Sequence, residues 1–262
     1  FGDSAEDAMR VAAELGFLEA DPTLDVEGYD AAQKAAILAS IAFHTEVPVS
    51  AVHREGITKV TATEVEAARK SGHVITLLAV AERLKNEVEG ISARVYPVLI
   101  ERQHPLAAVY EGKNAVFVEA EAAGELMFYG AGAGGVETAS AVLGDLVSTA
   151  RRHVAGGPGI PGSMHADLPL LPIGDVLSRY QIMLEVSDEP GVLATVAGIL
   201  AENGASAASV EQSVPRDAHG TATLVIGTHT ARESALAATV SALEASAVVS
   251  QVTSVLRVEG NS

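Results

Sequence analysis

The sequence predicts an α/β protein of the α+β kind, in which a mixed sheet covered by helices is followed by a ferredoxin-like βαββαβ domain. Two observations lead to this prediction. Segments with apolar residues at helical spacing alternate with segments rich in β-branched and aromatic residues. Glycine and proline then cluster between residues 156 and 172, where neither a helix nor a central strand can continue. We therefore expect two domains, 1–155 and 176–262, joined by a linker over residues 156–175.

The first domain combines four expected helices with four expected strands. Helical spacing of apolar residues predicts the helices at residues 5–15, 30–43, 61–71 and 136–153. Alternation of β-branched and aromatic residues predicts the strands at residues 74–80, 92–100, 115–121 and 126–129. Residues 16–29 hold four carboxylates and are expected to form a loop. Because nearly all residues after its first turn are apolar, the helix at 30–43 is expected to be buried, and helices should cover one face of the sheet.

The second domain has a simpler pattern. Strands are expected at residues 180–186, 206–214, 221–228 and 248–258, and helices at residues 192–203 and 232–246. Their order along the chain is βαββαβ. The turn at residues 188–191 leads directly into the first of these helices, and we expect it to bind the carboxylate of a small molecule through free backbone N–H groups.

Charge and composition exclude several classes of function. The 17 basic residues face 34 acidic ones, for a net charge of −17, so binding to nucleic acid or to an anionic membrane is not expected. The chain has no cysteine, which excludes disulfides and thiolate zinc sites, and its histidines are scattered, so no metal site is expected. Without a signal peptide or a membrane-spanning run, a cytoplasmic location is expected. The chain begins without methionine and enters a helical pattern almost at once, which indicates a fragment.

Asp30 and Lys34 are the candidate catalytic pair. They stand four residues apart at the start of an expected helix, so both project from one face, and Asp30 is placed to cap or begin that helix. A lysine held by a carboxylate can exchange a proton with a carbonyl oxygen. The alternative is a solvated surface pair contributing about 0.3 to 0.5 kcal/mol. The apolar helix that follows favours the functional interpretation.

The acidic loop before this pair leaves three interpretations open. Its four carboxylates are Glu19, Asp21, Asp25 and Glu27. They could bind the ammonium group of an amino-acid substrate, hold a cation, or lie in water. Calcium is the weaker hypothesis, because the regular spacing and the bidentate glutamate of a calcium loop are lacking.

Residues 130–135 satisfy the G-x-G-x-x-G pattern of a dinucleotide site. The helix after them runs into the linker, however, with no second strand ending in an acidic residue that could hold a ribose. One alternative is a turn that needs glycine for its backbone geometry. We favour an intermediate interpretation, in which this turn closes against a cofactor held mainly by another part of the protein.

Residues 16–34 resemble the signature of the homoserine dehydrogenases. The resemblance continues through Glu55-Gly56-Ile57, His104-Pro105-Leu106, Asn114-Ala115-Val116 and the glycine turn with Thr138-Ala139. Residues 186–193, Val-Ser-Asp-Glu-Pro-Gly-Val-Leu, resemble an ACT domain, and the combination is similar to the actinobacterial enzymes. The resemblance implies reversible, NAD- or NADP-dependent reduction of L-aspartate 4-semialdehyde to L-homoserine, in threonine and methionine biosynthesis.

The resemblance also implies roles for individual residues. Lys34 would exchange the proton at the substrate oxygen, and Asp30 would orient substrate and lysine. Glu19 and Asp25 would hold the amino-acid end, and Gly16, Glu19 and Gly134 would lie against the cofactor. In the ACT domain, an amino-acid effector, with threonine the first choice, would be bound by Asp188, Gly191, Val192 and Leu193.

Two departures from the family pattern affect these expectations. Glu137 stands where the family usually has proline. A nucleotide-binding domain, which would hold most of the NAD or NADP and most of a monovalent-cation site, would precede Phe1, and the helix at 136–155 would close toward it. The fragment alone is therefore expected to be inactive, and the whole protein to be a dimer or tetramer. The alternative function is a non-catalytic module that senses amino acids.

Overall fold

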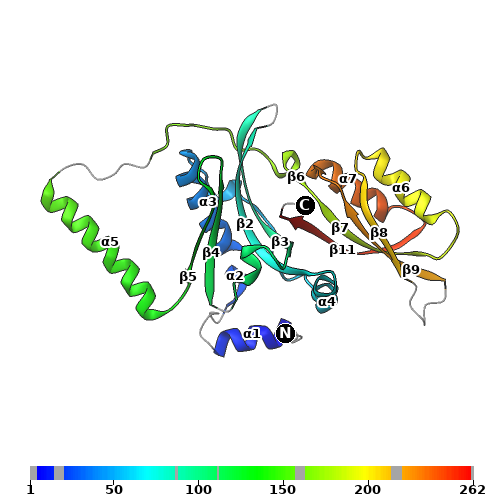
Figure 1. Ribbon diagram of the computed structural model, residues 1–262, viewed down its shortest axis with the longest axis horizontal. Helices are drawn as coiled ribbons and strands as arrows, with labels where there is room; N and C mark the ends of the chain where they lie inside the picture. Colours follow the sequence, from blue (N-terminus) through cyan, green and yellow to red (C-terminus); the bar gives the residue numbers. More distant parts are fainter. Residues whose placement is uncertain are drawn as a thin grey trace.

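The computed structural model describes residues 5–14, 21–85, 88–110, 112–156, 163–213 and 220–260. Figure 1 shows a pair of long strands with helices beside it, a second body of strands and helices next to it, and one long helix that stands apart from both. The expected mixed α/β architecture is confirmed. The first expected helix is also present, as α1 (Ala5–Glu14).

The centre of the first domain is an antiparallel pair of long strands, β2 (His73–Lys85) and β3 (Glu89–Glu101). Every residue of β2 pairs with a residue of β3. The sequence predicted both strands but made them too short, because polar residues at their ends continue the pairing. Arg83 and Glu89, for example, form an ion pair at 2.9 Å near the turn.

Helices α3 (Tyr29–Phe43) and α4 (Ala62–Lys70) cover one face of this pair of strands. The strands present odd-numbered apolar residues to these helices, among them Ile75, Leu77, Ala81, Ala93, Val95 and Leu99. The opposite face is covered by the short helix η2 (Pro105–Ala108), which packs against Tyr96, Val98 and Ile100. Helices therefore flank both faces of this pair of strands, with α3 and α4 together on one face as expected and the short η2 on the other.

Helix α3 is buried on one side only, which corrects the expectation for the whole helix. The buried side consists of small residues, Ala32, Ala35, Ala36 and Ala39. The larger Ile37, Leu38 and Ile41 are 60%, 41% and 65% exposed. The alanines let the helix lie close to the sheet, and the bulky apolar side chains remain on the surface.

A second hairpin and the longest helix stand away from this core. Strands β4 (Lys113–Ala120) and β5 (Gly124–Ala131) pair only with each other among the described residues, and α5 (Gly135–Ala155) follows them. Figure 1 shows α5 separated from the remaining helices. All residues of β5 and α5 are exposed. A row of apolar side chains nevertheless runs along α5 at helical spacing: Val142, Leu143, Leu146 and Val147.

The second domain has the predicted βαββαβ order. Its elements are β7 (Tyr180–Ser187), α6 (Val192–Glu202), β8 (Ala207–Ser213), β9 (Thr221–Thr228), α7 (Glu233–Glu244) and β11 (Val249–Glu259). The strands form an antiparallel sheet in the order β11-β7-β9-β8. Alternate residues of the central strands pack against both helices in one core, which includes Ile182, Leu184, Val196, Leu224, Ile226 and Leu236.

The sheets of the two domains are continuous, which the sequence did not predict. Strand β2 covers one edge of β3 along its whole length. On the other edge lie two strands that both run parallel to β3: the short β1 (His53–Arg54), opposite Arg94 and Val95, and β11, opposite residues 98–100. Strand β11 therefore belongs to both domains.

The connector between the domains lies against the first domain in its described part, residues 163–175. The N–H of Ile91 donates to the carbonyl of Pro169 at 2.9 Å, and the N–H of Leu171 donates to the carbonyl of Ile91 at 2.8 Å. Within this part, η3 (Ile173–Asp175) precedes β6 (Leu177–Ser178), which pairs with β10 (Ala231–Arg232). No helix in the described part of the chain has both the length and the apolar character needed to cross a bilayer.

Candidate active site

The acidic loop contains a single helical turn, α2 (Thr23–Val26), which corrects the loop predicted for residues 16–29 in its second half. Asp21 precedes this turn, and its carboxylate accepts hydrogen bonds from the hydroxyl and the N–H of Thr23 at 2.6 and 3.0 Å. These bonds lower the pKa of Asp21. The predicted site residues Gly16 and Glu19 lie outside the described residues.

Gly28 makes the turn from α2 into α3. Its φ of 77° lies in the left-handed region that favours glycine, and a Cβ there would lie 3.2 Å from Cγ1 of Val95. The N–H of Gly28 donates to the carbonyl of Asp25 at 3.0 Å, and its own carbonyl accepts from Ala32 at 2.9 Å. This turn joins Asp25, whose side chain is exposed, to the helix that carries the candidate catalytic pair.

Asp30 and Lys34 project from the same face of α3, as predicted. Nζ of Lys34 donates to Oδ2 of Asp30 at 2.5 Å. The two side chains are 46% and 56% exposed, so the pair is open to a molecule arriving from solution. Asp30 lies in the first turn of the helix but does not cap it, because Gly28 occupies the N-cap position. Asp30 therefore has its carboxylate available to hold the lysine.

Residues 53–58, here the 53–58 segment, lie against the turn between α2 and α3, and no role was expected for them from their residue types. The guanidinium of Arg54 lies 3.6 Å from the ring centroid of Tyr29, as a cation–π contact. Arg54 also donates a hydrogen bond to the carbonyl of Glu27. The resemblance at Glu55-Gly56-Ile57 marked this segment, but the contacts themselves join residues far apart in the sequence.

The side chain of Glu55 lies on the face of the sheet opposite to that of Arg54. It belongs to a largely buried charge cluster with Arg257 of β11. Both terminal nitrogens of Arg257 donate to the Glu55 carboxylate at 2.9 Å. Nε of Arg257 donates to Glu233 at 2.7 Å, and the Tyr180 hydroxyl donates to the same carboxylate at 2.6 Å. The guanidinium lies 4.3 Å from the ring centroid of Tyr96. The side chains of Arg257 and Glu233 are 13% and 4% exposed.

Burial and hydrogen bonding act in opposite directions on Glu55. Burial raises the pKa of its carboxyl group, but hydrogen bonds from His53 and Arg257 outweigh burial and lower the pKa to about 2. Burial also raises the pKa of Tyr180, and the nearby guanidinium only partly opposes this effect. At neutral pH the cluster therefore holds an ionised Glu55 against Arg257, next to a neutral Tyr180.

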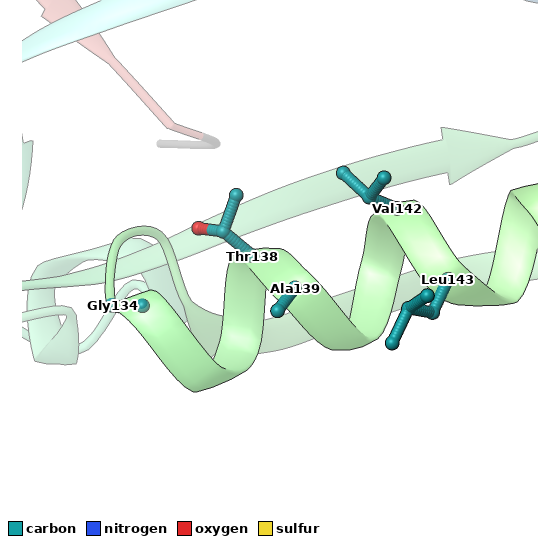
Figure 2. Close-up of a pocket in the computed structure, with 6 residues that line it drawn as sticks. Gly134, Thr138, Ala139, Val142 and Leu143 are labelled. Carbon is teal, nitrogen blue, oxygen red and sulfur yellow. The ribbon is translucent and has the colours of Figure 1, made fainter.

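The glycine turn before α5 needs glycine at one position, as one of the interpretations expected, because Gly134 has a φ of 134°. At Gly132 a Cβ would lie 2.2 Å from Nδ2 of Asn114, so the Asn114 side chain would have to move. After the turn, a shallow apolar hollow lies along the first half of α5, lined by Gly134, Gly135, Thr138, Ala139, Val142 and Leu143. Figure 2 shows Thr138 and Val142 projecting from one side of the helix and Ala139 and Leu143 from another.

The turn into α6 leaves most of the predicted effector residues accessible. Asp188, Gly191 and Leu193 are exposed, whereas the side chain of Val192 is buried in the core of the second domain. Val192 can therefore offer a ligand its backbone but not its side chain. Gly191 holds the N-cap position with a φ of 96°. Oδ1 of Asp188 accepts a long hydrogen bond of 3.5 Å from Gln212.

Three of the described histidines make local structural contacts. His44 and His165 stack with their ring centroids 4.8 Å apart, and Nδ1 of His104 accepts from the N–H of Leu106 at 3.2 Å. Over the described ranges, no group of three or more histidine, aspartate or glutamate side chains is arranged to hold a metal ion.

Comparison with known proteins gives two family matches. Residues 2–147 match the homoserine dehydrogenase family, and residues 180–247 match the ACT domain. Among curated relatives, the homoserine dehydrogenase of Corynebacterium glutamicum is 50% identical over 261 residues, which is 98% of this chain and 58% of the relative. That of Mycobacterium tuberculosis H37Rv is 52% identical over 259 residues, 97% of this chain and 58% of the relative. The chain thus spans less than two thirds of the length of these relatives.

Solved structures give the same result. A homoserine dehydrogenase from Thiobacillus denitrificans is 36% identical, with a TM-score of 0.89 over 98% of this chain and 59% of the other. The Staphylococcus aureus homoserine dehydrogenase at pH 7.0 is 28% identical, with a TM-score of 0.70 over 99% and 60% of the two chains. The fold and the matches define a domain of an oxidoreductase family joined to an ACT domain. The chain belongs to the homoserine dehydrogenase family.

Proposed function

We propose that this chain is the substrate-binding and regulatory part of a homoserine dehydrogenase, which interconverts L-homoserine and L-aspartate 4-semialdehyde with NAD or NADP in threonine and methionine biosynthesis. The observation that carries the proposal is the Asp30–Lys34 pair, open to solution at the start of α3 and preceded by acidic side chains. The family match and the relatives' names support it.

In this proposal Lys34 and Asp30 act at the aldehyde or hydroxyl end of the substrate, and the acidic residues before them act at its amino-acid end. The ammonium of Lys34 donates a proton to the aldehyde oxygen during reduction, and its neutral amine takes the hydroxyl proton during oxidation. Asp30 holds the lysine in place through the 2.5 Å hydrogen bond. Asp25, together with Glu19, attracts the ammonium group of the amino acid, which keeps the reacting carbon near Lys34.

The glycine turn offers a secondary contact for the nicotinamide cofactor, which accepts or supplies the hydride when it is bound. The N-terminus of α5 has Gly134 at its N-cap and exposed backbone N–H groups in its first turn, which suits an anionic group. Glu137, on the same turn, carries a negative charge to this end of the helix. Gly134 therefore suits a secondary contact with a cofactor that another part of the protein holds more strongly. The exposed apolar row of α5 is available for packing against a further part of the protein.

The test of this function uses the complete natural protein. Purified protein should oxidise L-homoserine with NAD or NADP, which is followed as absorbance of the reduced nicotinamide. L-Serine, which is one methylene shorter, is the matched control substrate and should react far more slowly. Equal rates with both substrates, or no reaction with homoserine, would contradict the assignment.

The 262-residue chain alone is expected to show no measurable hydride transfer with either nicotinamide. A single glycine turn lacks the second strand and acidic residue that hold a dinucleotide. The same absorbance assay checks this, with the complete protein as the positive control. Saturable activity of the chain would show that the glycine turn binds the cofactor by itself.

We infer that the ACT domain binds a small amino acid, with threonine the first candidate because the proposed enzyme feeds its synthesis. The N–H of Asp188 already donates to the carbonyl of Gly220 at 2.9 Å, so a carboxylate would be bound by N–H groups in the first turn of α6. The exposed Asp188 side chain supplies a charge for an ammonium group. Assembly of the protein as a dimer or tetramer stays a prediction, and effector binding would depend on it if paired ACT domains share the ligand.

Calorimetric titration of the chain with threonine should release or absorb heat that saturates at millimolar concentration, because the turn contacts both ends of the amino acid. Isoleucine, methionine and lysine should bind more weakly, and Asp188→Asn should abolish the heat with threonine. The matched control is Asp175→Asn, which changes the same residue type in the connector that precedes the domain. Absence of heat and of thermal stabilisation with all four amino acids would remove the effector role.

A further inference from the structure

We propose that Arg257 of the ACT domain is a positioning residue for the substrate site, because it holds Glu55 and, through the 53–58 segment, the turn that carries Asp25. The inference rests on the proposed function and adds a residue from the far end of the chain to it. Its basis is the continuous set of contacts from β11 to α2.

Arg257 and Glu55 meet because two strands follow one another along the same edge of β3. Strand β1 ends at Arg54, opposite Val95, and Glu55 continues it by donating its N–H to the Val95 carbonyl at 2.8 Å. Strand β11 begins its pairing with β3 at Arg257, opposite Val98. The two side chains therefore emerge close together on the face that carries Tyr96, and the guanidinium fork binds the carboxylate with both terminal nitrogens.

Neighbouring residues of the 53–58 segment point to opposite faces of the sheet, as in any strand. Glu55 reaches Arg257 on one face, while Arg54 on the other face stacks on Tyr29 and donates to the carbonyl of Glu27. One dipeptide thus links the ACT domain to the turn between α2 and α3. A shift of Glu55 has to move Arg54, because the two share a peptide bond.

The remainder of the segment binds α2 directly. The N–H of Ile57 donates to the carbonyl of Val26 at 2.8 Å, and the hydroxyl of Thr58 donates to Glu27 at 3.1 Å. Gly56 lies so close that a Cβ on it would be 2.5 Å from the Val26 carbonyl oxygen. The segment and α2 are therefore in backbone contact, with no side chain between them.

The substrate site has one part on α3, with Lys34, and one part on α2, with Asp25. These two parts depend to different degrees on the contact between α2 and the 53–58 segment. Helix α3, with Lys34, is fixed to the sheet by its own buried alanines. Helix α2, all of which is described, has no buried residue, so its position depends on its contacts with α3, on Gly28 and on the 53–58 segment. Loosening Glu55 should thus disturb the amino-acid end of the substrate at Asp25 more than proton transfer at Lys34.

The test is Glu55→Gln in the complete protein, since the amide keeps the shape and leaves the Arg257–Glu233 pair intact. KM for homoserine should rise about tenfold, while kcat and KM for the nicotinamide stay within about twofold. Arg257→Lys should give the same pattern, because one ammonium cannot hold both carboxylates as the fork does. The double variant should be no worse than the more impaired single variant, since both changes break one link.

The matched controls are Glu66→Gln and Arg69→Lys, which make the same changes in an exposed ion pair on α4. Both should leave every kinetic constant unchanged. The proposal is overturned if Glu55→Gln and Arg257→Lys leave KM for homoserine unchanged, or if they change the two KM values and kcat together, as general destabilisation would.

Amide hydrogen exchange separates this inference from the proposed reaction. In Glu55→Gln, the amides of residues 25–28 and of Ile57 should exchange about tenfold faster than in Glu66→Gln, whatever the protein catalyses. Faster exchange in a protein without homoserine oxidation would refute the reaction but support the positioning role. Unchanged exchange in an active enzyme would refute the positioning role alone.

Discussion

Lys34→Ala in the complete protein is expected to reduce turnover of homoserine about 100-fold or more, the usual scale for loss of a general acid or base. Affinity for the nicotinamide should stay nearly unchanged, because the side chain lies on α3 and pairs with Asp30. Steady-state kinetics in the homoserine-oxidising direction measure both quantities. Lys34→Arg should be almost as slow, since a guanidinium keeps the charge but does not release its proton near neutral pH.

Lys70→Ala is the matched control for this prediction. Lys70 forms a pair of the same spacing with Glu66 at 3.8 Å and is 75% exposed, yet it lies at the end of α4. Its loss should leave turnover unchanged. If Lys34→Ala turned over homoserine like the unaltered enzyme, Lys34 would have no part in the chemistry, and the Asp30–Lys34 pair would be an ordinary surface pair.

Arg257→Met is expected to cause the largest loss of stability, about 3 to 5 kcal/mol in the free energy of unfolding. Methionine fills a similar volume, so the loss comes mainly from Glu233, whose side chain is 4% exposed and would be left buried without its ionic partner. Urea unfolding of the 262-residue chain at neutral pH, followed by circular dichroism, measures the effect.

Two further variants identify the cause of that loss. Arg69→Met removes an equally close but exposed ion pair with Glu66 and should cost less than about 1 kcal/mol. Adding Glu233→Gln to Arg257→Met should recover part of the stability, because a neutral amide can still accept from Tyr180 without a buried charge. If the double variant were less stable than Arg257→Met, the uncompensated carboxylate would not be the cause.

The elements that the sequence predicted well are those whose signal is local. Apolar spacing located α3 and α6, and alternation located β3 and β9, because these periods follow the geometry of a helix and of a strand. The Asp30–Lys34 contact was predictable for the same reason, since four residues make one helical turn. The ends of β2 and β3 were missed, because charged pairs there give no apolar alternation.

The contacts that the sequence could not predict join distant residues through the backbone. Pairing of β11 with β3 uses N–H and carbonyl groups, which every residue except proline carries, so no residue type marks it. Arg257 and Glu55 are 202 positions apart, and their fork forms only because two strands share one edge. The single helical turn at α2 was missed because four residues show no helical period, and Asp25 is equally compatible with a loop.

Because β11 pairs with β3, the sheet of the first domain is complete only after β11 has been synthesised. A ribosome delivers residues 1–155 long before β11, so during that interval the end of β3 carries unpaired N–H and carbonyl groups, an edge of the kind that invites pairing with another chain. Cutting the chain in the connector and removing the second domain would leave this edge of β3 open permanently. It would also leave Glu55 without the guanidinium of Arg257. Residues made after the first domain thus complete its sheet, and removal of the ACT domain together with β11 would leave that edge open.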